Sequence, residues 1–364
     1  MKLVIFGLTV SSSWGNGHAT LWRGLCGALA RRGHQVVFFE RDVPYYASAR
    51  DLTELPLGGK LVLYPDWADV ERLAREHVQS ADVTIVTSYC PDAFPASSLS
   101  GAGLRVFYDL DTPVTLARLA KGESVDYAGP NGYRDYDLVL SYTGGPALID
   151  LQTVLGAKRT AALYGSVDPD VHKPAPAQER YKATLSYMGT WSADRDEALQ
   201  MRFIEPARRL PNHRFIIGGS KYDSDFPWLP NIYFVSHVAP PDHSAFYCSA
   251  DLTLNVTRGP MAQMGYCPSG RLFEAAACGV PILSDNWPGL DAFYEPGKEV
   301  LIAESTEDAM DAITLSSAEL ARIGRAARER TMACHTAGVR ALELEHLLEN
   351  AASRSAATEA VCGA

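Results

Sequence analysis

The chain has 364 residues and a formal net charge of −10, with 47% hydrophobic and 21% charged residues. This length exceeds one ordinary domain core and the composition excludes a disordered chain, so two domains are expected. The acidic balance argues against nucleic acid as a general partner, and no apolar run approaches the roughly 20 residues of a membrane-spanning helix.

The first half of the chain alternates short apolar runs with amphipathic stretches. Strands are expected at residues 3–6, 36–39, 61–63, 83–86, 105–108, 138–140 and 161–163. Helical periodicity lies between them, as at 19–32 and 68–78. Continuously apolar strands separated by helices indicate a parallel sheet that is covered on both faces.

A turn-rich segment over 165–176 separates this half from a second round of the same alternation. Strands are expected there at 184–188, 214–217, 232–234, 252–255, 280–283 and 300–303. Helices are expected at 193–209, 242–249, 271–278 and 307–313, and a long helical stretch follows over 317–350. The pattern predicts an α/β protein of two Rossmann-like, doubly wound domains that join near residue 165.

The seven cysteines are scattered, without a CxxC pair or a zinc-like spacing. Their odd number and apolar surroundings indicate reduced, mostly buried thiols, which favours a cytoplasmic protein. The apolar run that opens the chain is short and leads directly into a Gly/Ser loop and a helix. A first β-strand is therefore expected there rather than a signal peptide.

The loop after the first expected strand is a candidate phosphate-facing surface. Gly15, Asn16 and Gly17 precede a helix whose N-terminal N–H groups favour an anion. A dinucleotide site is an alternative, because Glu40 ends the second strand as a ribose-binding acid would, although the glycines lie too far beyond the first strand for that motif. A plain capped loop also remains open, as does a structural role for His18 in place of a base or substrate contact.

The stretch 268–285 reads as a short helix that leads into a strand. Ser269 is expected to cap the helix and Gly279 to end it. Arg271 and Glu274 lie one turn apart at its start, where a cation and backbone N–H groups suit a diphosphate and a carboxylate suits ribose hydroxyls. An ordinary ion pair between these two neighbours is the alternative.

This stretch resembles the donor-binding motif of group 1 (family 4 type) glycosyltransferases, E-x7-E-A-x-A-C-G-x-P-V, and especially that of their CgeB-like (spore-maturation-protein) relatives. Further segments resemble the family in its order: 164–174 the interdomain link, 187–190 the first strand of the nucleotide domain, 235–252 the base-binding region and 106–113 the acceptor-side strand end. The resemblance implies the GT-B fold, in which two Rossmann-like domains face each other across a cleft.

The resemblance also implies a division of the chain. An acceptor-side domain is expected over 1–165, a nucleotide-sugar-binding domain over 166–335, and a crossover helix over 336–350 that packs on the first domain. The last residues, 351–364, are small and polar and are expected to fray.

Carried over residue by residue, the motifs predict the donor site. Glu274 would bind the donor ribose. The diphosphate would lie against Ser269, Gly270, Arg271, Gly189 and Thr190, with further positive charge from Arg195 or Arg258. The base would lie beside His237 and Val238.

Two positions depart from the family's pattern. The first Glu of E-x7-E, which contacts the transferred sugar in the family, corresponds to Tyr266, and the acceptor-side His is replaced by Tyr108. The chemistry that recognises the sugar is therefore altered. Neither the sugar's identity nor the stereochemical outcome carries over.

A metal-independent reaction is expected, with no metal site, because no Asp-x-Asp motif lies at a suitable place in the donor half. Arginine side chains and helix N-termini would then stabilise the leaving nucleotide. Retention of configuration is typical of the family. An inverting reaction would need a base, for which His18, Asp109 and Asp111 are the candidates, although the two aspartates also fit a capped turn.

The expected activity is transfer of a sugar from a nucleoside-diphosphate donor, with UDP favoured, to a hydroxyl acceptor, without a separate cofactor. A sugar-nucleotide epimerase of the same fold and a non-catalytic nucleotide- or sugar-binding protein are the alternatives. The sequence does not identify the base, the sugar or the acceptor.

Overall fold

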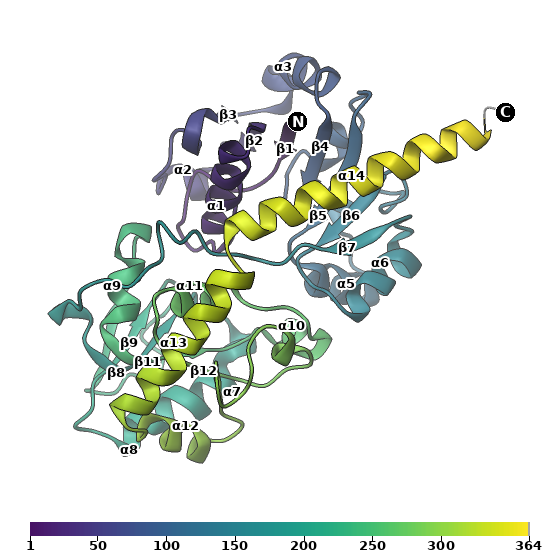
Figure 1. Cartoon of the computed structure of the whole chain (residues 1–364). Coiled ribbons are helices and arrows are strands. Elements are labelled where there is room, and N and C mark those ends of the chain that lie inside the picture. The colour runs from purple at the N-terminus through teal and green to yellow at the C-terminus, as the bar shows by residue number, and fades with distance from the viewer. Residues whose placement is uncertain (363–364) are drawn as a thin grey trace. The chain divides into compact units, whose positions relative to one another are not determined.

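The chain divides into two units, each built on one parallel sheet (Figure 1). Unit 1 comprises Met1–Tyr164 and Ala337–Ala364, and unit 2 comprises Gly165–Thr336. The computed structural model describes residues 1–362, with side chains through residue 353. Unit 1 is discontinuous in sequence, because unit 2 lies between its two segments along the chain.

Unit 1 contains a seven-stranded sheet in the order β3-β2-β1-β4-β5-β6-β7. Its strands are β1 (Lys2–Phe6), β2 (Gln35–Arg41), β3 (Lys60–Tyr64), β4 (Val83–Thr87), β5 (Leu104–Asp109), β6 (Leu138–Ser141) and β7 (Thr160–Ala162). Its α-helices are α1 (His18–Arg31), α2 (Pro44–Ala47), α3 (Trp67–Gln79), α4 (Ala93–Ser97), α5 (Thr112–Ala120), α6 (Pro146–Leu155) and α14 (Ala337–Cys362), with 3-10 turns at Pro56–Gly58 and Asp126–Ala128. The strand order reverses between β1 and β4.

Both faces of this sheet are covered, as its continuously apolar strands predict. Successive side chains of a strand point to opposite faces. Phe38 packs edge-on against Trp22 of α1, with ring centroids 5.4 Å apart, whereas Phe39 stacks on Phe6 at 4.9 Å. Both phenylalanines of β2 are therefore buried, on opposite sides of the sheet.

Unit 2 contains a six-stranded sheet in the order β10-β9-β8-β11-β12-β13. Its strands are β8 (Ala183–Met188), β9 (Phe215–Gly218), β10 (Ile232–Val235), β11 (Ala250–Asn255), β12 (Ile282–Ser284) and β13 (Leu301–Ile302). Its α-helices are α7 (Asp196–Leu199), α8 (Glu205–Arg209), α9 (His243–Cys248), α10 (Gly259–Met264), α11 (Gly270–Ala277), α12 (Thr306–Ile313) and α13 (Ser317–Cys334). Shorter helical turns lie at Glu179–Tyr181, Ala193–Arg195, Gln200–Ile204, Pro240–Asp242 and Leu290–Ala292. The order reverses between β8 and β11, and in open parallel sheets ligands bind at the carboxyl ends of strands at such a point.

The expected strands are all present, and their ends lie within two residues of the predicted ones. The helical stretch expected over 317–350 is two helices, α13 and α14, which break at His335 and Thr336. The His335 ring packs on Phe273 with centroids 4.8 Å apart, a tertiary contact that periodicity does not reveal. Over 351–362, where a frayed tail is expected, α14 continues, in keeping with the alanines of that stretch. Residues 363–364 lie outside the described part.

Helix α14 belongs to unit 1, where it packs against α1 and β5 (Figure 1, yellow). Its Glu345 carboxylate accepts hydrogen bonds from Arg32 and His34, each at 2.5 Å. The hydrogen bond from Arg32, more than the one from His34, lowers the pKa of Glu345 to about 2. Within the described residues, no helix combines the length and the apolarity that crossing a bilayer requires.

Candidate functional site

Polar side chains meet where the strand order of unit 2 reverses. Met188 ends β8 and Asn255 ends β11, the two strands on either side of that point. The Nε atom of Arg271 donates to the Met188 carbonyl, and its Nη1 atom donates to Asn255 Oδ1 at 2.9 Å. These two contacts fix a positive charge at the carboxyl ends of both central strands.

The start of α11 lies beside this charge. The Ser269 hydroxyl donates to Asn255 Oδ1 at 2.7 Å and, within the part of the chain that the structure describes, does not cap the helix. Asn255 thus holds both the residue before the helix and its first arginine. The N–H groups of the first turn and the Arg271 guanidinium together suit an anion.

Glu274 lies one turn further along α11, with 12% of its side chain exposed. The Tyr247 hydroxyl of α9 donates to its Oε2 atom at 3.2 Å. Burial, and then the Glu274 charge, raise the pKa of Tyr247 well above its usual value, so this hydroxyl stays a donor. Tyr247 therefore fixes one carboxylate oxygen of Glu274.

The other oxygen of Glu274 faces a histidine pair. Its Oε1 atom lies 4.0 Å from Nε2 of His172, which lies 3.2 Å from Nδ1 of His243. His243 Nε2 lies 3.0 Å from the Val238 carbonyl, which can only accept, so this nitrogen carries the proton and Nδ1 carries the lone pair. His172 is 2% exposed, and burial lowers its pKa. Its Nδ1 atom has no hydrogen-bond partner among the described residues.

Gly189 and Thr190, predicted at the phosphates, follow β8 directly. A Cβ atom on Gly189 would lie 2.7 Å from the Tyr187 hydroxyl and 3.1 Å from Arg271 Nη2. Gly219, with φ of 152°, packs so closely that its Cβ would lie 2.0 Å from the Gly189 carbonyl oxygen. The backbone here approaches Arg271 because position 189 has no side chain.

The two further arginines extend this group. Arg195 Nη1 donates to the Thr190 carbonyl at 2.8 Å, and Arg258 Nε donates to Asp194 at 3.2 Å.

The residues predicted beside the base, His237 and Val238, lie after β10. Tyr266 lies in the loop before α11, with φ of 49° and its N–H bonded to the Pro288 carbonyl at 2.7 Å.

The structure thus brings Ser269, Gly270, Arg271, Glu274, Gly189 and Thr190 together in unit 2. Sequence reasoning missed Asn255, Tyr247, His172 and His243 as parts of this site. The one signal for Asn255 was its place at the end of an expected strand. His172 lies in the segment 164–174 and the other two in 235–252, both of which resemble the family, but nothing in those segments marks these side chains as neighbours of Glu274.

The predicted phosphate-facing loop lies in unit 1. Asn16 Oδ1 accepts from the His18 N–H at 3.0 Å, and Asn16 Nδ2 donates to the Thr9 carbonyl at 3.1 Å. Gly17 precedes α1, and His18 is its half-buried first residue. Asn16 therefore uses one of the N–H groups that a phosphate would need.

Glu40 is 1% exposed and holds the same loop. Its Oε2 atom accepts from the N–H groups of Val10 and Ser11 at 2.7 and 3.0 Å. Its Oε1 atom accepts from the hydroxyls of Ser11, at 2.5 Å, and of Thr9. These contacts engage the carboxylate within the fold and oppose the dinucleotide alternative, in which Glu40 would bind a ribose.

Asp109, a candidate base, ends β5 and is completely buried. Its carboxylate accepts from Tyr133 Oη at 3.0 Å, from Thr115 Oγ1 at 3.2 Å and from the Asp111 N–H at 3.1 Å. Burial raises the pKa of Asp109 to about 6, against the opposing effect of these hydrogen bonds. Such surroundings favour the capped-turn alternative for Asp109.

Asp111 and Tyr108 flank Asp109. Asp111 is 8% exposed and precedes α5. The Tyr108 hydroxyl donates to the Leu163 carbonyl at 2.6 Å inside the core, which gives this departure from the family's pattern a structural role.

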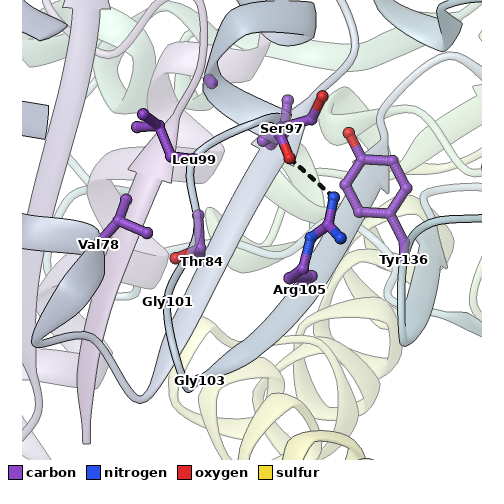
Figure 2. Close-up of a pocket in the computed structure, with 10 residues that line it drawn as sticks. Val78, Thr84, Ser97, Leu99, Gly101, Gly103, Arg105 and Tyr136 are labelled. Atoms are coloured by element: carbon purple, nitrogen blue, oxygen red, sulfur yellow. Dashed lines mark hydrogen bonds between the residues drawn. The ribbon is translucent and has the colours of Figure 1, made fainter. Parts of the chain in front are cut away.

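A small pocket of unit 1 lies near the amino ends of its central strands, away from Asp109 at the carboxyl end of β5 (Figure 2). Thr84 and Arg105, near the amino ends of β4 and β5, line it together with Ser97 and Tyr136. Arg105 Nη2 donates to the Ser97 carbonyl at 2.8 Å, as the dashed line shows. The pocket is therefore separate from the carboxyl ends of the strands, where ligands of such sheets bind.

Residues 195–346 match the protein family described as Glycosyl transferase-like. No curated protein matches the sequence. Solved structures similar to this chain include sucrose-phosphate synthase from Thermosynechococcus elongatus, with 14% identity, 97% of this chain and 99% of that chain covered, and a TM-score of 0.70. Anabaena HepE, in complex with UDP and glucose, shares 14% identity over 96% of this chain and 100% of its own, with a TM-score of 0.67.

A third similar structure is alpha-glucosyltransferase (AGT) in complex with UDP, at 11% identity, 96% and 100% coverage and a TM-score of 0.70. At these identities the likeness establishes the fold. The chain thus has the GT-B fold, with two Rossmann-like domains, and carries a glycosyl transferase-like domain over residues 195–346, which confirms the expectation of a glycosyltransferase.

Proposed function

We propose that unit 2 binds a nucleoside-diphosphate sugar, with UDP as the nucleotide, and that the protein transfers the sugar to a hydroxyl acceptor. The observation that carries this proposal is the meeting of Arg271, Asn255 and the start of α11 at the point where the strand order reverses. HepE and AGT, which share the fold, were each solved with UDP, which supports the choice of nucleotide.

In this proposal the diphosphate lies against Arg271 and the first turn of α11. Gly189 allows the phosphates close to the backbone, and Arg195 and Arg258 add positive charge nearby. Glu274 accepts hydrogen bonds from the ribose hydroxyls while Tyr247 holds its second oxygen. His237 and Val238 lie beside the base, and Tyr266 contacts the sugar.

The reaction requires stabilisation of the charge on the departing diphosphate. The bond between the anomeric carbon and the diphosphate oxygen breaks, the acceptor oxygen bonds to that carbon, and its proton passes to a phosphate oxygen. We assign the stabilisation to Arg271 and the α11 N–H groups, so that the reaction needs no metal. Because the proton passes to a phosphate oxygen of the donor, the acceptor attacks on the face that the diphosphate leaves, and the configuration is retained. An inverting reaction would need His18 or Asp111 as the base, since the Asp109 carboxylate is buried and already bonded.

Three finer assignments belong to the same proposal. The order of the motifs supports membership of the CgeB-like branch. The scattered cysteines support a cytoplasmic location. AGT has also been solved with UDP-glucose and DNA, but the net charge of −10 argues against a nucleic-acid acceptor here.

The first test is a thermal-shift series with UDP, GDP, TDP, ADP and CDP in EDTA. One nucleotide, UDP, should raise the melting temperature of the wild type by about 5 °C or more at a hundredfold excess over its Kd. Glu274→Ala should lose most of this shift, and Glu329→Ala, an exposed glutamate of α13, should keep it. Absence of a shift with all five nucleotides in the wild type would refute the donor site.

Turnover separates the transferase from the alternatives. Slow release of UDP from UDP-sugars, accelerated by a hydroxyl acceptor, is expected of a transferase. Interconversion of the sugar without net UDP release would indicate an epimerase. Tight binding without either reaction would indicate a binding protein.

A further inference from the structure

Three side chains that bind transition metals converge beside the proposed donor site. His172 follows a turn in which its N–H bonds to the Asp168 carbonyl at 2.9 Å, His243 begins α9, and Glu274 lies in α11. Their ligand atoms all lie within 4.8 Å of one another. The three come from separate segments of unit 2 and are each largely buried.

The distances fit one small cation. Zinc binds imidazole nitrogen at about 2.0–2.1 Å in a tetrahedral arrangement, so neighbouring ligand atoms lie about 3.3 Å apart. His172 Nε2 and His243 Nδ1 are 3.2 Å apart, and Glu274 Oε1 is 4.0 Å from His172 Nε2. All three ligand atoms lie within 4.8 Å of one another, so a change in the side-chain torsions of Glu274 that moves Oε1 toward both nitrogens would complete the arrangement.

Partners outside the cluster orient two of the three ligands. His243 Nε2 donates to the Val238 carbonyl at 3.0 Å, so the lone pair of Nδ1 points toward His172. Tyr247 donates to Glu274 Oε2 at 3.2 Å and so holds the orientation of the carboxylate. Hydrogen bonds of this kind, from a histidine to a carbonyl and from a hydroxyl to a carboxylate, are the usual second layer of a metal site.

We propose that His172 Nε2, His243 Nδ1 and Glu274 Oε1 bind one divalent transition-metal ion of the zinc type, with a fourth position open. Two imidazoles and one carboxylate suit Zn²⁺ or Co²⁺, whereas Mg²⁺ and Ca²⁺ prefer oxygen ligands. The metal is not part of the transfer reaction proposed above. It occupies the carboxylate oxygen that a ribose would use.

The metal ion and the donor nucleotide should compete for Glu274, an expectation that rests on the proposed function. If Glu274 binds the donor ribose, bound Zn²⁺ must weaken UDP and UDP must weaken Zn²⁺ by the same factor. The site would then make donor binding sensitive to free zinc.

The test uses tag-free protein freed of metal with EDTA and dialysed into a buffer that does not bind metal. Titration with Co²⁺ should give the intense visible absorption of a four-coordinate ion, saturating at one equivalent and displaced by Zn²⁺. His243→Ala should weaken binding by more than roughly 100-fold, since changes to second-layer partners alone cost about 10- to 100-fold. His213→Ala, an exposed histidine of the same unit, should bind as the wild type does.

Glu274→Gln separates the loss of a metal ligand from the loss of the fold, because it keeps the shape of the side chain and removes only its charge. It should melt within a few degrees of the wild type and lose the four-coordinate spectrum. A wild type without saturable Co²⁺ binding, or binding that survives in both His243→Ala and Glu274→Gln, would overturn the site.

The metal site and the donor site can fail separately. A protein that shifts with UDP in EDTA but binds no Co²⁺ refutes the metal site alone. A protein that binds Co²⁺ but no nucleotide keeps the metal site and refutes the proposed function. Simultaneous, independent binding of Zn²⁺ and UDP would refute the shared carboxylate.

Discussion

The two sheets present backbone N–H groups at the points where their strand orders reverse, and the two units treat these groups in opposite ways. In unit 1 the loop after β1 directs the N–H groups of Val10 and Ser11 to the buried Glu40 carboxylate. In unit 2 the start of α11 carries Arg271, which donates to Asn255. The Ser269 hydroxyl also donates to Asn255 and, in the described part of the chain, does not accept from the first N–H groups of α11. The same fold therefore binds its own carboxylate in unit 1, whereas the proposed donor site of unit 2 would use such groups for a ligand's anion.

Removing the buried Glu40 carboxylate of unit 1 should produce the largest change in stability. Glu40→Ala leaves two N–H groups and two hydroxyls buried without an acceptor, which should cost about 3–5 kcal/mol of unfolding free energy. Urea unfolding measures this, with Glu40→Gln expected to lose about half as much. Exposed Glu54 provides the control, since Glu54→Ala should be nearly neutral. A small loss in Glu40→Ala would mean that the loop does not depend on this carboxylate.

The second carboxylate of unit 1, Asp109, predicts a pH dependence. Its folded-state pKa of about 6 lies above the unfolded value near 3.8, so the fold favours the protonated form. Asp109 therefore lowers stability as the pH rises from about 4 to 6, by up to about 3 kcal/mol, and has no further effect above that range. In Asp109→Asn this decline should be absent, so the free energy of unfolding of the variant relative to the wild type should rise between pH 4 and 6. A difference that stays constant over this range, measured by urea unfolding, would contradict the assignment.

On the unit 2 side, Arg271 is the charge that distinguishes the two loops. Arg271→Ala should weaken UDP binding by about 2–3 kcal/mol, or roughly 30- to 150-fold, because a charge-assisted contact to the diphosphate is lost. Calorimetric titration measures this. Arg271→Lys should recover part of the affinity, since it keeps the charge but not the fork that spans Met188 and Asn255.

Exposed Arg325 of α13 serves as the matched control. Arg325→Ala should bind UDP as the wild type does. An equal loss in both variants would show that the effect is one of overall charge.

Two tyrosine-to-phenylalanine variants, one in each unit, test the same comparison with the smallest expected change in UDP affinity. Tyr247 donates to Glu274 in unit 2, and Tyr133 donates to Asp109 in unit 1, at 3.2 and 3.0 Å. Tyr247→Phe should weaken UDP binding by about 1 kcal/mol, or roughly fivefold, because Glu274 loses its orientation. Tyr133→Phe should lower the stability of unit 1 and leave UDP affinity unchanged. Equal effects of the two variants on affinity would contradict separate roles.

The sheets could be predicted from the sequence because short, continuously apolar runs between helical stretches are typical of buried parallel strands. The residues 3–6, for example, are fully buried in β1. The grouping of Ser269, Arg271 and Glu274 at the start of α11 could also be predicted, since the three lie within six consecutive residues, whereas their role in donor binding stays a prediction. The break between α13 and α14 was expected only from the resemblance, which sets a boundary at residues 335 and 336; periodicity alone gives one stretch over 317–350, because the packing of His335 on Phe273 leaves no periodic signal.

The rest of the site could not be predicted, because its members are distant in sequence. His172, His243 and Glu274 come together only when the turn after β7, α9 and α11 pack in unit 2. For Glu40 the sequence indicates an acid at a strand end, but not whether that acid binds a ligand or the loop. Only the contacts of its two oxygens decide this.

The discontinuity of unit 1 has a consequence for synthesis on the ribosome. Residues 165–336 emerge as a complete unit while the sheet β1–β7 still lacks α14. Ala341, Leu344 and Leu348 of that helix are buried, so the apolar surface they cover stays open to water until α14 has been made. Unit 2 can therefore finish folding before unit 1 does, and residues 1–164 depend on chaperones until α14 has emerged.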